Sequence, residues 1–319
     1  FDLENFSKKV ATDGTKQGKT LWDYQQDALR HAIKGLWRYY GQPGDADSQT
    51  RKRQVARWYR DNSAPLDDVV AGKAALLRLL GDYYPVENGR VGYEHLINRM
   101  GFWMATGSGK TLVIVKLLEI LRGLMARDLI PRRDVLVLTH REDLLRQIRD
   151  HVAEFNAAAQ SVNSVHIRLR DLKEYPEVKR EFPSLLSRNE ITVFTYRSDN
   201  LSDEQKERII DFRNYDNDGH WYVLLDEAHK GDKDDSKRQH IYSILSRDGF
   251  LFNFSATFTD DRDVLTTAAK FNLASFIARG YGKHITVMRQ EMRVFDRQED
   301  YSDEEKQRMI EALKKATGH

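Results

Sequence analysis

The sequence predicts an α/β fold with a mainly parallel sheet that is covered by helices on both faces. Short apolar runs recur from Gly101 onward, and amphipathic segments of helical length separate them. The polar residues that could carry chemistry follow these apolar runs directly. Strands that alternate with helices in this way form parallel sheets. Ligands of such sheets bind at the carboxyl ends of the strands.

The individual elements follow from apolar spacing and from turn residues. Upstream, residues 21–40 have apolar residues at helical spacing, residues 41–50 are a predicted loop, and two helices are expected at residues 51–62 and 66–80. The predicted strands are residues 101–105, 134–140, 164–169, 191–196, 221–226 and 250–256. The predicted helices between them are residues 111–128, 141–159 and 202–215. A strand or linker at residues 285–298 and a capped helix at residues 302–319 complete the chain.

Composition limits the class of protein. The chain has 319 residues, of which 40% are hydrophobic, so it can form a large core. Its 51 basic and 49 acidic residues give a net charge of +2, so any nucleic-acid site must come from local clustering. Because there is no cysteine, disulfides and thiolate metal sites are excluded. No apolar stretch is long enough for a membrane span, and the first residues lack the apolar core of a signal peptide, so we expect a cytoplasmic protein without membrane contact.

The segment "ATGSGKT", residues 105–111, lies between a predicted strand and an apolar helix. That is the context in which a phosphate-binding loop occurs. Gly107 and Gly109 allow a tight turn, and the helix N-terminus adds positive potential. Lys110 can reach terminal phosphates, and the hydroxyl of Thr111 can bind Mg²⁺. The competing interpretation is a glycine-rich turn before a buried helix.

A second motif, "WYVLLDEAH", ends a predicted strand in two carboxylates. Asp226 can hold Mg²⁺ opposite Thr111, and Glu227 can orient and deprotonate an attacking water. By itself this pattern is equally typical of an acidic loop after a buried strand. Its occurrence with Lys110 in one strand–helix series favours the catalytic interpretation.

One further segment combines basic and aromatic residues. "RKRQVARWYR", residues 51–60, has five basic side chains with Trp58 and Tyr59 beside them. Such a helix can bind phosphates and stack on bases. A solvated helix whose aromatic residues pack inward explains the pattern equally well.

The two motifs together resemble motifs I and II of superfamily 2 helicases and translocases. The sequence around these motifs is similar to that of the Res (helicase) subunit of type III restriction enzymes and of related DEAD/DEAH-box proteins. "LWDYQQDAL" resembles the upstream Q-type motif, although many relatives carry arginine where this chain has Trp22. "LVLTHREDLLRQI" resembles motif Ia, "VFTYRS" motif Ib and "FNFSATFTD" motif III. The resemblance covers roughly residues 21–285.

The resemblance implies a RecA-like P-loop NTPase domain with an N-terminal helical insertion, ATP and Mg²⁺ as cofactors, and a role for each motif. The implied nucleotide-binding residues are Gln25, Thr106, Gly107, Ser108, Gly109, Lys110 and Thr111. The implied catalytic residues are Lys110, Asp226, Glu227 and His229, with Thr111 and Asp226 as metal ligands. The implied coupling residues are Ser255, Ala256 and Thr257. The implied nucleic-acid contacts are His140, Arg141, Thr195, Tyr196 and Arg197.

The expected domain organisation has four parts. Residues 1–40 are an N-terminal segment with the Q-type motif, residues 41–100 are the helical insertion, and residues 101–285 are the first RecA-like motor domain. Residues 286–319 are a linker or the start of a second domain. No motif typical of a second RecA-like domain follows Ile285, and we see no nuclease motif. Because the second domain supplies arginine fingers in this superfamily, we expect that domain to be absent from this chain and the fragment to hydrolyse ATP poorly.

The leading hypothesis is the ATP-binding motor domain of a superfamily 2 DNA helicase or translocase of a type III restriction-like or phage-defence kind. Nucleic acid is the expected partner, with DNA favoured over RNA. A methyltransferase (modification) subunit or another defence-system protein is a candidate protein partner. The alternative is a nucleotide-gated binding module that grips nucleic acid or protein without productive turnover. A small-molecule P-loop kinase is disfavoured, because it gives Glu227 and the distal "SAT" no role.

Overall fold

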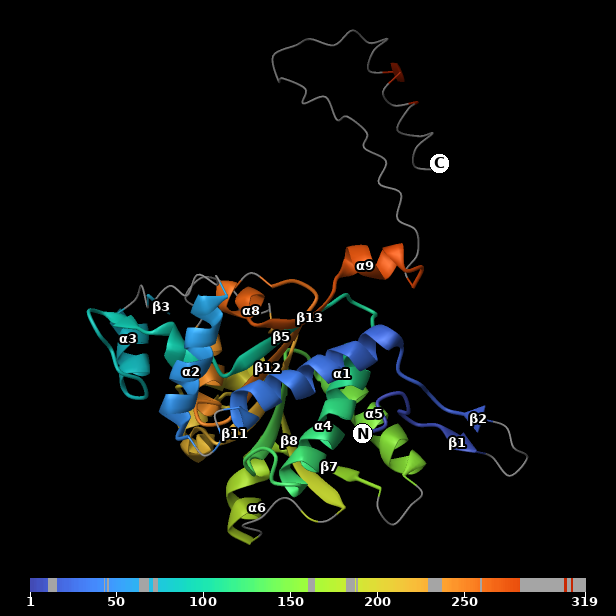
Figure 1. Ribbon diagram of the computed structural model, residues 1–319, viewed down its shortest axis with the longest axis horizontal. Coiled ribbons are helices and arrows are strands. Elements are labelled where there is room, and N and C mark those ends of the chain that lie inside the picture. Colours follow the sequence, from blue (N-terminus) through green and yellow to red (C-terminus); the bar gives the residue numbers. More distant parts are fainter. Residues whose placement is uncertain are drawn as a thin grey trace. The chain divides into compact units, whose positions relative to one another are not determined.

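The computed structural model describes residues 1–10, 16–42, 44, 46–62, 69–70, 74–159, 164–181, 187, 189–228, 237–258, 260–281, 307–308 and 311. The chain divides into two compact units, Phe1–Gly282 and Lys283–His319. The second unit is described at three residues only, so the predicted elements at residues 285–298 and almost all of residues 302–319 lie outside the described residues. The first unit holds the sheet and its helices (Figure 1).

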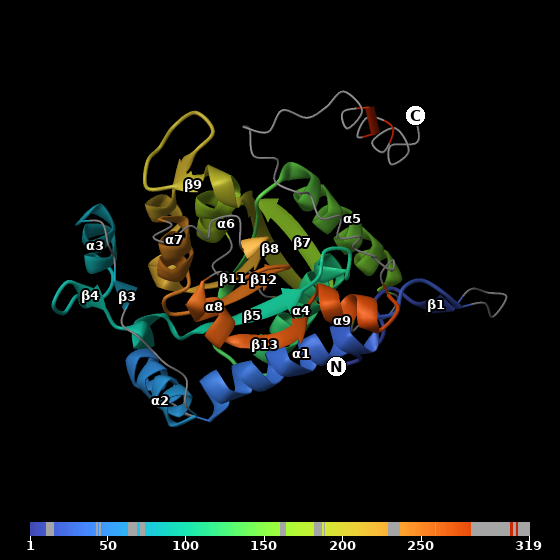
Figure 2. The same cartoon turned by 90° about the horizontal axis from the view of Figure 1, so that it is seen from above.

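A seven-stranded parallel sheet forms the centre of the first unit. Its strand order is β13-β5-β12-β11-β6-β8-β7, and every neighbouring pair in it is parallel. Figure 2 shows β13 and β7 at opposite margins of this sheet. The strands are β5 (Arg99–Met104), β6 (Asp134–Thr139), β7 (His166–Asp171), β8 (Glu190–Arg197), β11 (Trp221–Asp226), β12 (Phe250–Ser255) and β13 (Thr267–Phe271). The predicted α/β fold with a mainly parallel sheet is thus confirmed.

Two hydrophobic clusters cover the two faces of the sheet. Along β6, Val135 and Val137 pack into one cluster, and Leu136 and Leu138 pack into the other. Successive side chains of a strand point to opposite faces, so a strand buried on both faces is apolar at every position. The first cluster joins the sheet to α1 (Asp23–Leu36), α4 (Lys110–Ala126) and α5 (Glu142–Ala158). The second joins it to α3 (Ala74–Gly81), α6 (Tyr175–Glu181) and α7 (Lys237–Leu245).

The remaining elements are short or peripheral. An N-terminal helical insertion contains α2 (Ser48–Asp61) and α3, and α1 continues into a π-helical turn at Trp37–Gly41. The other helices are α8 (Asp261–Leu265) and α9 (Leu273–Ala278). Three two-stranded pairs lie outside the main sheet: β1 (Lys9–Val10) with β2 (Lys16–Gln17), β3 (Val69–Val70) with β4 (Arg90–Val91), and β9 (Leu201–Ser202) with β10 (Ile210–Asp211). Short 3-10 turns occur at Tyr93–Leu96, Leu172–Glu174, Ser198–Asn200, Phe212–Tyr215 and Asn217–Gly219.

All six predicted strands are confirmed with small shifts of their ends, but two element predictions are wrong. Residues 202–215 do not form a helix: they contain β10 and a 3-10 turn. Within residues 202–215 the buried side chains are Ile210 and Phe212, which are two positions apart. This alternation is typical of a strand, and it would leave a helix without an apolar stripe to bury. The second is the helix expected at residues 66–80, because helix begins only at Ala74 and Val69–Val70 forms a strand with β4.

The strand β13 was not predicted at all. Its sequence, "TAAKF", has little of the β-branched and aromatic character that marks strands, and only Ala269 and Phe271 are buried. It pairs with β5 at the margin of the sheet, so a tertiary contact decides its conformation.

We predict that Gly249→Ala destabilises the fold. A Cβ atom at Gly249 would lie 1.9 Å from the carbonyl oxygen of Trp221, where β11 and β12 start side by side. Because the Trp221 atoms nearest to this Cβ belong to the backbone, the strands themselves must move. We expect a loss of about 1–3 kcal/mol in the free energy of unfolding. Gly81→Ala is the control, because its Cβ would meet Val86 at an ordinary 3.5 Å. Denaturant unfolding measures both; equal stability of the two variants would contradict the prediction.

Candidate active site

The glycine-rich loop connects the carboxyl end of β5 to the first residue of α4, Lys110. Gly107 and Gly109 have φ angles of 79° and 78°, in the left-handed region that favours glycine. A Cβ atom at Gly109 would lie 2.5 Å from the amide nitrogen of Gln25, whereas one at Gly107 would meet no atom within 4 Å. The loop is therefore tightly packed at Gly109 and open at Gly107, so a ligand can approach its backbone there.

Two side chains of α1 form hydrogen bonds to the glycine-rich loop. The hydroxyl of Tyr24 and the amide nitrogen of Gln25 both donate to the carbonyl oxygen of Ser108, at 2.8 and 2.9 Å. The side-chain oxygen of Gln25 accepts from the backbone N–H of Trp22 at 2.9 Å. The Tyr24 ring stacks on Phe271 of β13 with centroids 3.7 Å apart. Sequence reasoning missed Tyr24, although its position next to Gln25 in the Q-type motif was a usable signal.

The two carboxylates that end β11 lie near the loop. The ammonium of Lys110 is 3.3 Å from a carboxylate oxygen of Glu227. Only β12 separates β5 from β11, so the carboxyl ends of these two strands meet at one edge of the sheet. Glu227 has a φ of 58°, an uncommon conformation for a residue with a side chain. Its backbone N–H donates to Asp226 Oδ1 at 3.0 Å. Such local strain is concentrated at functional sites.

Asp226 is almost completely buried, with 2% of its surface exposed. Burial raises the pKa of its carboxyl to about 6, and the charge of Glu227 adds to this, while Lys110 acts in the opposite direction. A buried carboxylate of this kind is stabilised by a cation. No cluster of three or more His, Cys, Asp or Glu side chains suited to a metal occurs in the described part of the chain. Mg²⁺, however, uses one or two carboxylates together with substrate phosphates, and Asp226 with the half-buried Thr111 fits that mode.

An aromatic cavity adjoins the loop. It has a volume of about 390 Å³ and is lined by Lys19, Thr20, Trp22, Tyr24, Gln25, Gly107, Ser108, Gly109, Leu112, Phe276 and Tyr281. Trp22 and Tyr281 stack with centroids 4.3 Å apart, and both rings are partly exposed. Gly107, Ser108, Gly109 and Gln25 thus line one cavity with aromatic side chains from both ends of the first unit. The sequence contained no local signal for Phe276 or Tyr281, because they lie beyond the motifs.

The "SAT" segment begins at Ser255, the last residue of β12, between the two strand ends that carry the loop and the carboxylates. The hydroxyl of the fully buried Ser255 donates to the carbonyl of Thr257, and the N–H of Thr257 donates back to that hydroxyl at 3.1 Å. The indole N–H of Trp103 donates to the carbonyl of Ala256 at 2.9 Å. Trp103 is half-buried, and its side chain links the end of β5 to this segment.

The predicted nucleic-acid residues divide into two groups. His140 and Arg141 follow β6, and Arg197 ends β8 beside Thr139. Arg141 and Arg197 are accessible and each forms an ion pair with a nearby aspartate, Asp143 or Asp199. The other two are buried: Thr195 donates to the carbonyl of Arg170 at 3.3 Å, and the hydroxyl of Tyr196 donates to that of Arg208 at 3.3 Å.

A hollow of about 220 Å³ lies at the same ends of β6, β7 and β8. It is lined by Glu142, Leu145, Arg149, Asp171, Lys173, Tyr196, Arg197, Asn200 and Arg208. Sequence reasoning missed Arg149, Lys173 and Arg208, which come from three separate segments. His229, the remaining predicted site residue, lies outside the described residues.

We predict that Asp226→Asn stabilises the protein in the absence of Mg²⁺ at neutral pH. The pKa of Asp226 is about 6 in the folded protein, above the ordinary value of 3.8. Between these two pH values the folded protein therefore binds more protons than the unfolded protein does. The ionised carboxylate therefore costs stability above about pH 6, by up to about 3 kcal/mol. Denaturant unfolding should show the variant's advantage growing from pH 4 to 6 and staying constant above. The exposed Asp82→Asn is the control, and an advantage that does not change with pH would contradict the assignment.

Comparison with known proteins identifies the family. The family model described as "Type III restriction enzyme, res subunit" matches residues 19–260, more than half of the chain. Among solved structures, the UvsW helicase from bacteriophage T4 matches with 12% sequence identity and a TM-score of 0.30, over 84% of this chain and 90% of that chain. A search of curated proteins gave no match. No helix in the described ranges is long and apolar enough to cross a membrane. From the sequence match, the chain belongs to the type III restriction enzyme res subunit family, and it contains a superfamily 2 helicase-like motor domain of RecA-like fold.

Proposed function

We propose that this chain binds Mg²⁺-ATP at the glycine-rich loop and that, when joined to a second RecA-like domain, it couples ATP hydrolysis to movement on nucleic acid. The observation that carries the proposal is the 3.3 Å approach of Lys110, at the helix N-terminus, to Glu227 at the end of β11. A phosphate chain on the open side of Gly107 would meet a cation, a helix N-terminus and a candidate base in one place. Membership of a helicase family supports the same reaction.

Each residue has a role that its surroundings support. The first N–H groups of α4 and the ammonium of Lys110 bind the terminal phosphates. Asp226 and Thr111 hold Mg²⁺, which neutralises charge on the β- and γ-phosphates when it is bound. Glu227 accepts a proton from the attacking water. In the structure Lys110 pairs with Glu227, and bound phosphates would compete with Glu227 for the ammonium of Lys110.

The adenine base belongs in the aromatic cavity beside the loop. The family resemblance gives Gln25 the role of reading adenine, but both ends of its amide already bond within the protein, to Ser108 and Trp22. We therefore assign Gln25 first to holding the loop, and base stacking to Trp22 and Tyr281. A stacking role for Trp22 also gives a reason for tryptophan at this position of the Q-type motif, where many relatives carry arginine.

Nucleic acid, with DNA favoured, runs over the carboxyl ends of β6 and β8. The accessible Arg141 and Arg197, together with His140, are the proposed phosphate contacts. Their ion pairs with aspartates mean that a phosphate must displace a carboxylate, so binding should weaken strongly with salt. Ser255, Ala256 and Thr257 join the end of β5 to the end of β12 through Trp103, which supports a coupling role for this segment. His229 is proposed as part of the same relay on the resemblance alone.

The finer biological role also stays a proposal. Membership of the family supports a restriction or phage-defence function with a modification methyltransferase as partner. The division into residues 1–40, 41–100, 101–285 and 286–319 is part of the same proposal. Cytoplasmic localisation is part of the same proposal.

We predict that Lys110→Ala abolishes Mg²⁺-ATP binding measured by calorimetry, because it removes the cation that faces the phosphates. The side chain is nearly buried, so circular dichroism must show that the fold survives. Lys206→Ala removes the same charge from an exposed position and should bind ATP normally. If Lys110→Ala keeps wild-type affinity, the phosphate-binding assignment is wrong.

We predict that Glu227→Gln keeps ATP binding but slows hydrolysis by at least about 100-fold, since an amide cannot accept the water's proton. The assay is phosphate release with and without single-stranded and duplex DNA or RNA. An unchanged rate in the variant would identify another group as the base. A wild-type protein that includes a second RecA-like domain, and that binds ATP and nucleic acid but releases no phosphate under any of these conditions, would favour the nucleotide-gated binding module instead.

A further inference from the structure

A second cavity lies away from the proposed ATP site. It has a volume of about 430 Å³, within the usual range for ligand pockets. Arg99, Phe250 and Thr267 line it, and these residues begin β5, β12 and β13. The glycine-rich loop follows the other end of β5, about 20 Å away for a strand of six residues. The cavity therefore lies at the opposite edge of the sheet, between α1 and α2.

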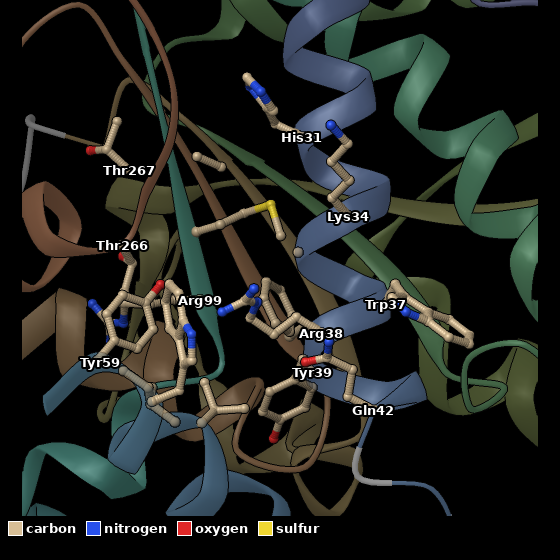
Figure 3. Close-up of a pocket in the computed structure, with 17 residues that line it drawn as sticks. His31, Lys34, Trp37, Arg38, Tyr39, Gln42, Tyr59, Arg99, Thr266 and Thr267 are labelled. Carbon is tan, nitrogen blue, oxygen red and sulfur yellow. The ribbon is translucent and has the colours of Figure 1, made fainter. Parts of the chain in front are cut away.

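One wall of this cavity is cationic. His31, Lys34 and Arg38 occur at spacings of three and four residues, which puts them on one face of α1 and its π-helical continuation. Figure 3 shows Arg38 extending from this helix toward the side of the cavity that holds Tyr59, Arg99 and Thr266. No aspartate or glutamate is among the described residues that line the cavity.

The positive charge on this wall is not neutralised. The described residues provide no salt-bridge partner for Lys34 or Arg38, and one terminal nitrogen of Arg38 is buried without a hydrogen-bond partner. Arg99 is different, because Asp263 lies 3.3 Å from it at a fully buried position. The charge available to a ligand thus comes from α1.

Aromatic rings form another part of the cavity wall. The guanidinium of Arg38 lies over the Trp58 ring, 3.7 Å from its centroid, and Tyr39 and Tyr59 also line the cavity. Trp37 and Trp58 are 56% and 40% exposed. Tryptophan rings this open to solvent, next to unpaired cations, are the combination that stacks bases while binding phosphates.

We propose that this cavity binds a planar nucleobase that carries phosphate, with the base against the exposed part of the Trp58 ring that Arg38 does not cover and the phosphate on Lys34 and Arg38. The absence of acidic lining residues disfavours a cationic ligand, and the unpaired charge disfavours a neutral one. The ligand is either a free mononucleotide or one nucleotide of a single strand. The site is separate from the glycine-rich loop and does not depend on the function proposed for it.

The test measures binding of AMP and of a short oligothymidylate to the chain by calorimetry. Lys110→Ala provides the background in which the glycine-rich loop is disabled. On that background Arg38→Gln and Trp58→Leu should each weaken binding by about fivefold or more, the lower limit for a lost base stack. Lys34→Gln, at an exposed position, gives a second charge variant that cannot harm the core. Arg57→Gln is the matched control, because Arg57 precedes Trp58 on α2, is exposed and does not line the cavity.

The outcomes separate the two sources of the ligand. Binding of AMP that depends on Arg38 and Trp58 supports a mononucleotide site. Binding of the oligonucleotide alone, with the same dependence, supports a site for single-stranded nucleic acid. The proposal is overturned if neither probe binds the Lys110→Ala chain, or if no probe loses affinity in any of the three cavity variants. It is also overturned if Arg57→Gln weakens binding as much as they do, because general surface charge would then explain the effect.

Discussion

The ion pair between Lys110 and Glu227 depends on almost every feature of the first unit. Its two members follow strands that are far apart in the sequence and separated by one strand in the sheet. Only parallel strands bring both carboxyl ends to one edge, and only a sheet buried on both faces holds them there. The alternate burial of Val135 and Leu136 in two clusters shows how completely both faces are covered. A lysine and a glutamate on the surface of a mobile loop would form such a pair only part of the time.

The same arrangement concentrates several features that destabilise the fold in one small region. Asp226 is buried enough to raise the pKa of its carboxyl to about 6, Glu227 has a left-handed backbone, and the loop contains two left-handed glycines. None of these stabilises the fold. The fold tolerates these costs because the apolar sheet buries a large surface. A bound cation and a phosphate chain would offset the cost of the buried charge and of the strained backbone. Strain and charge burial at a strand end are therefore consistent with the ligand proposed there.

Helix α1 connects the two ends of the sheet. Its first turn supplies Tyr24 and Gln25, which fix the Ser108 carbonyl in the glycine-rich loop. Its far end continues into the π-helical turn that carries Arg38 toward the second cavity. A helix of 14 residues is about 21 Å long, which matches the length of β5 between the two sites. One rigid element thus contacts both the proposed ATP site and the proposed nucleotide cavity.

How much could be predicted from the sequence depended on whether the signal was local. The six apolar strands, α4 with its glycine-rich start, and Asp226 at the end of β11 were predictable, because hydrophobic runs and turn residues act within a few positions. The helix expected at residues 202–215 was wrong, because its charged residues have helical propensity but no apolar stripe to bury. β13 was missed, because only its pairing with β5 makes it a strand.

By itself the sequence determined the fold class and which residues could meet a phosphate chain, since these depend on residue type, order and spacing along one segment. Only the tertiary structure decided that Tyr24 supports the loop, that Tyr281 stacks on Trp22, and that Lys34, Arg38 and Trp58 line one cavity. The reason is physical: contacts between distant segments are set by how whole helices pack on the sheet, and that packing depends on the summed burial of many side chains rather than on any one motif.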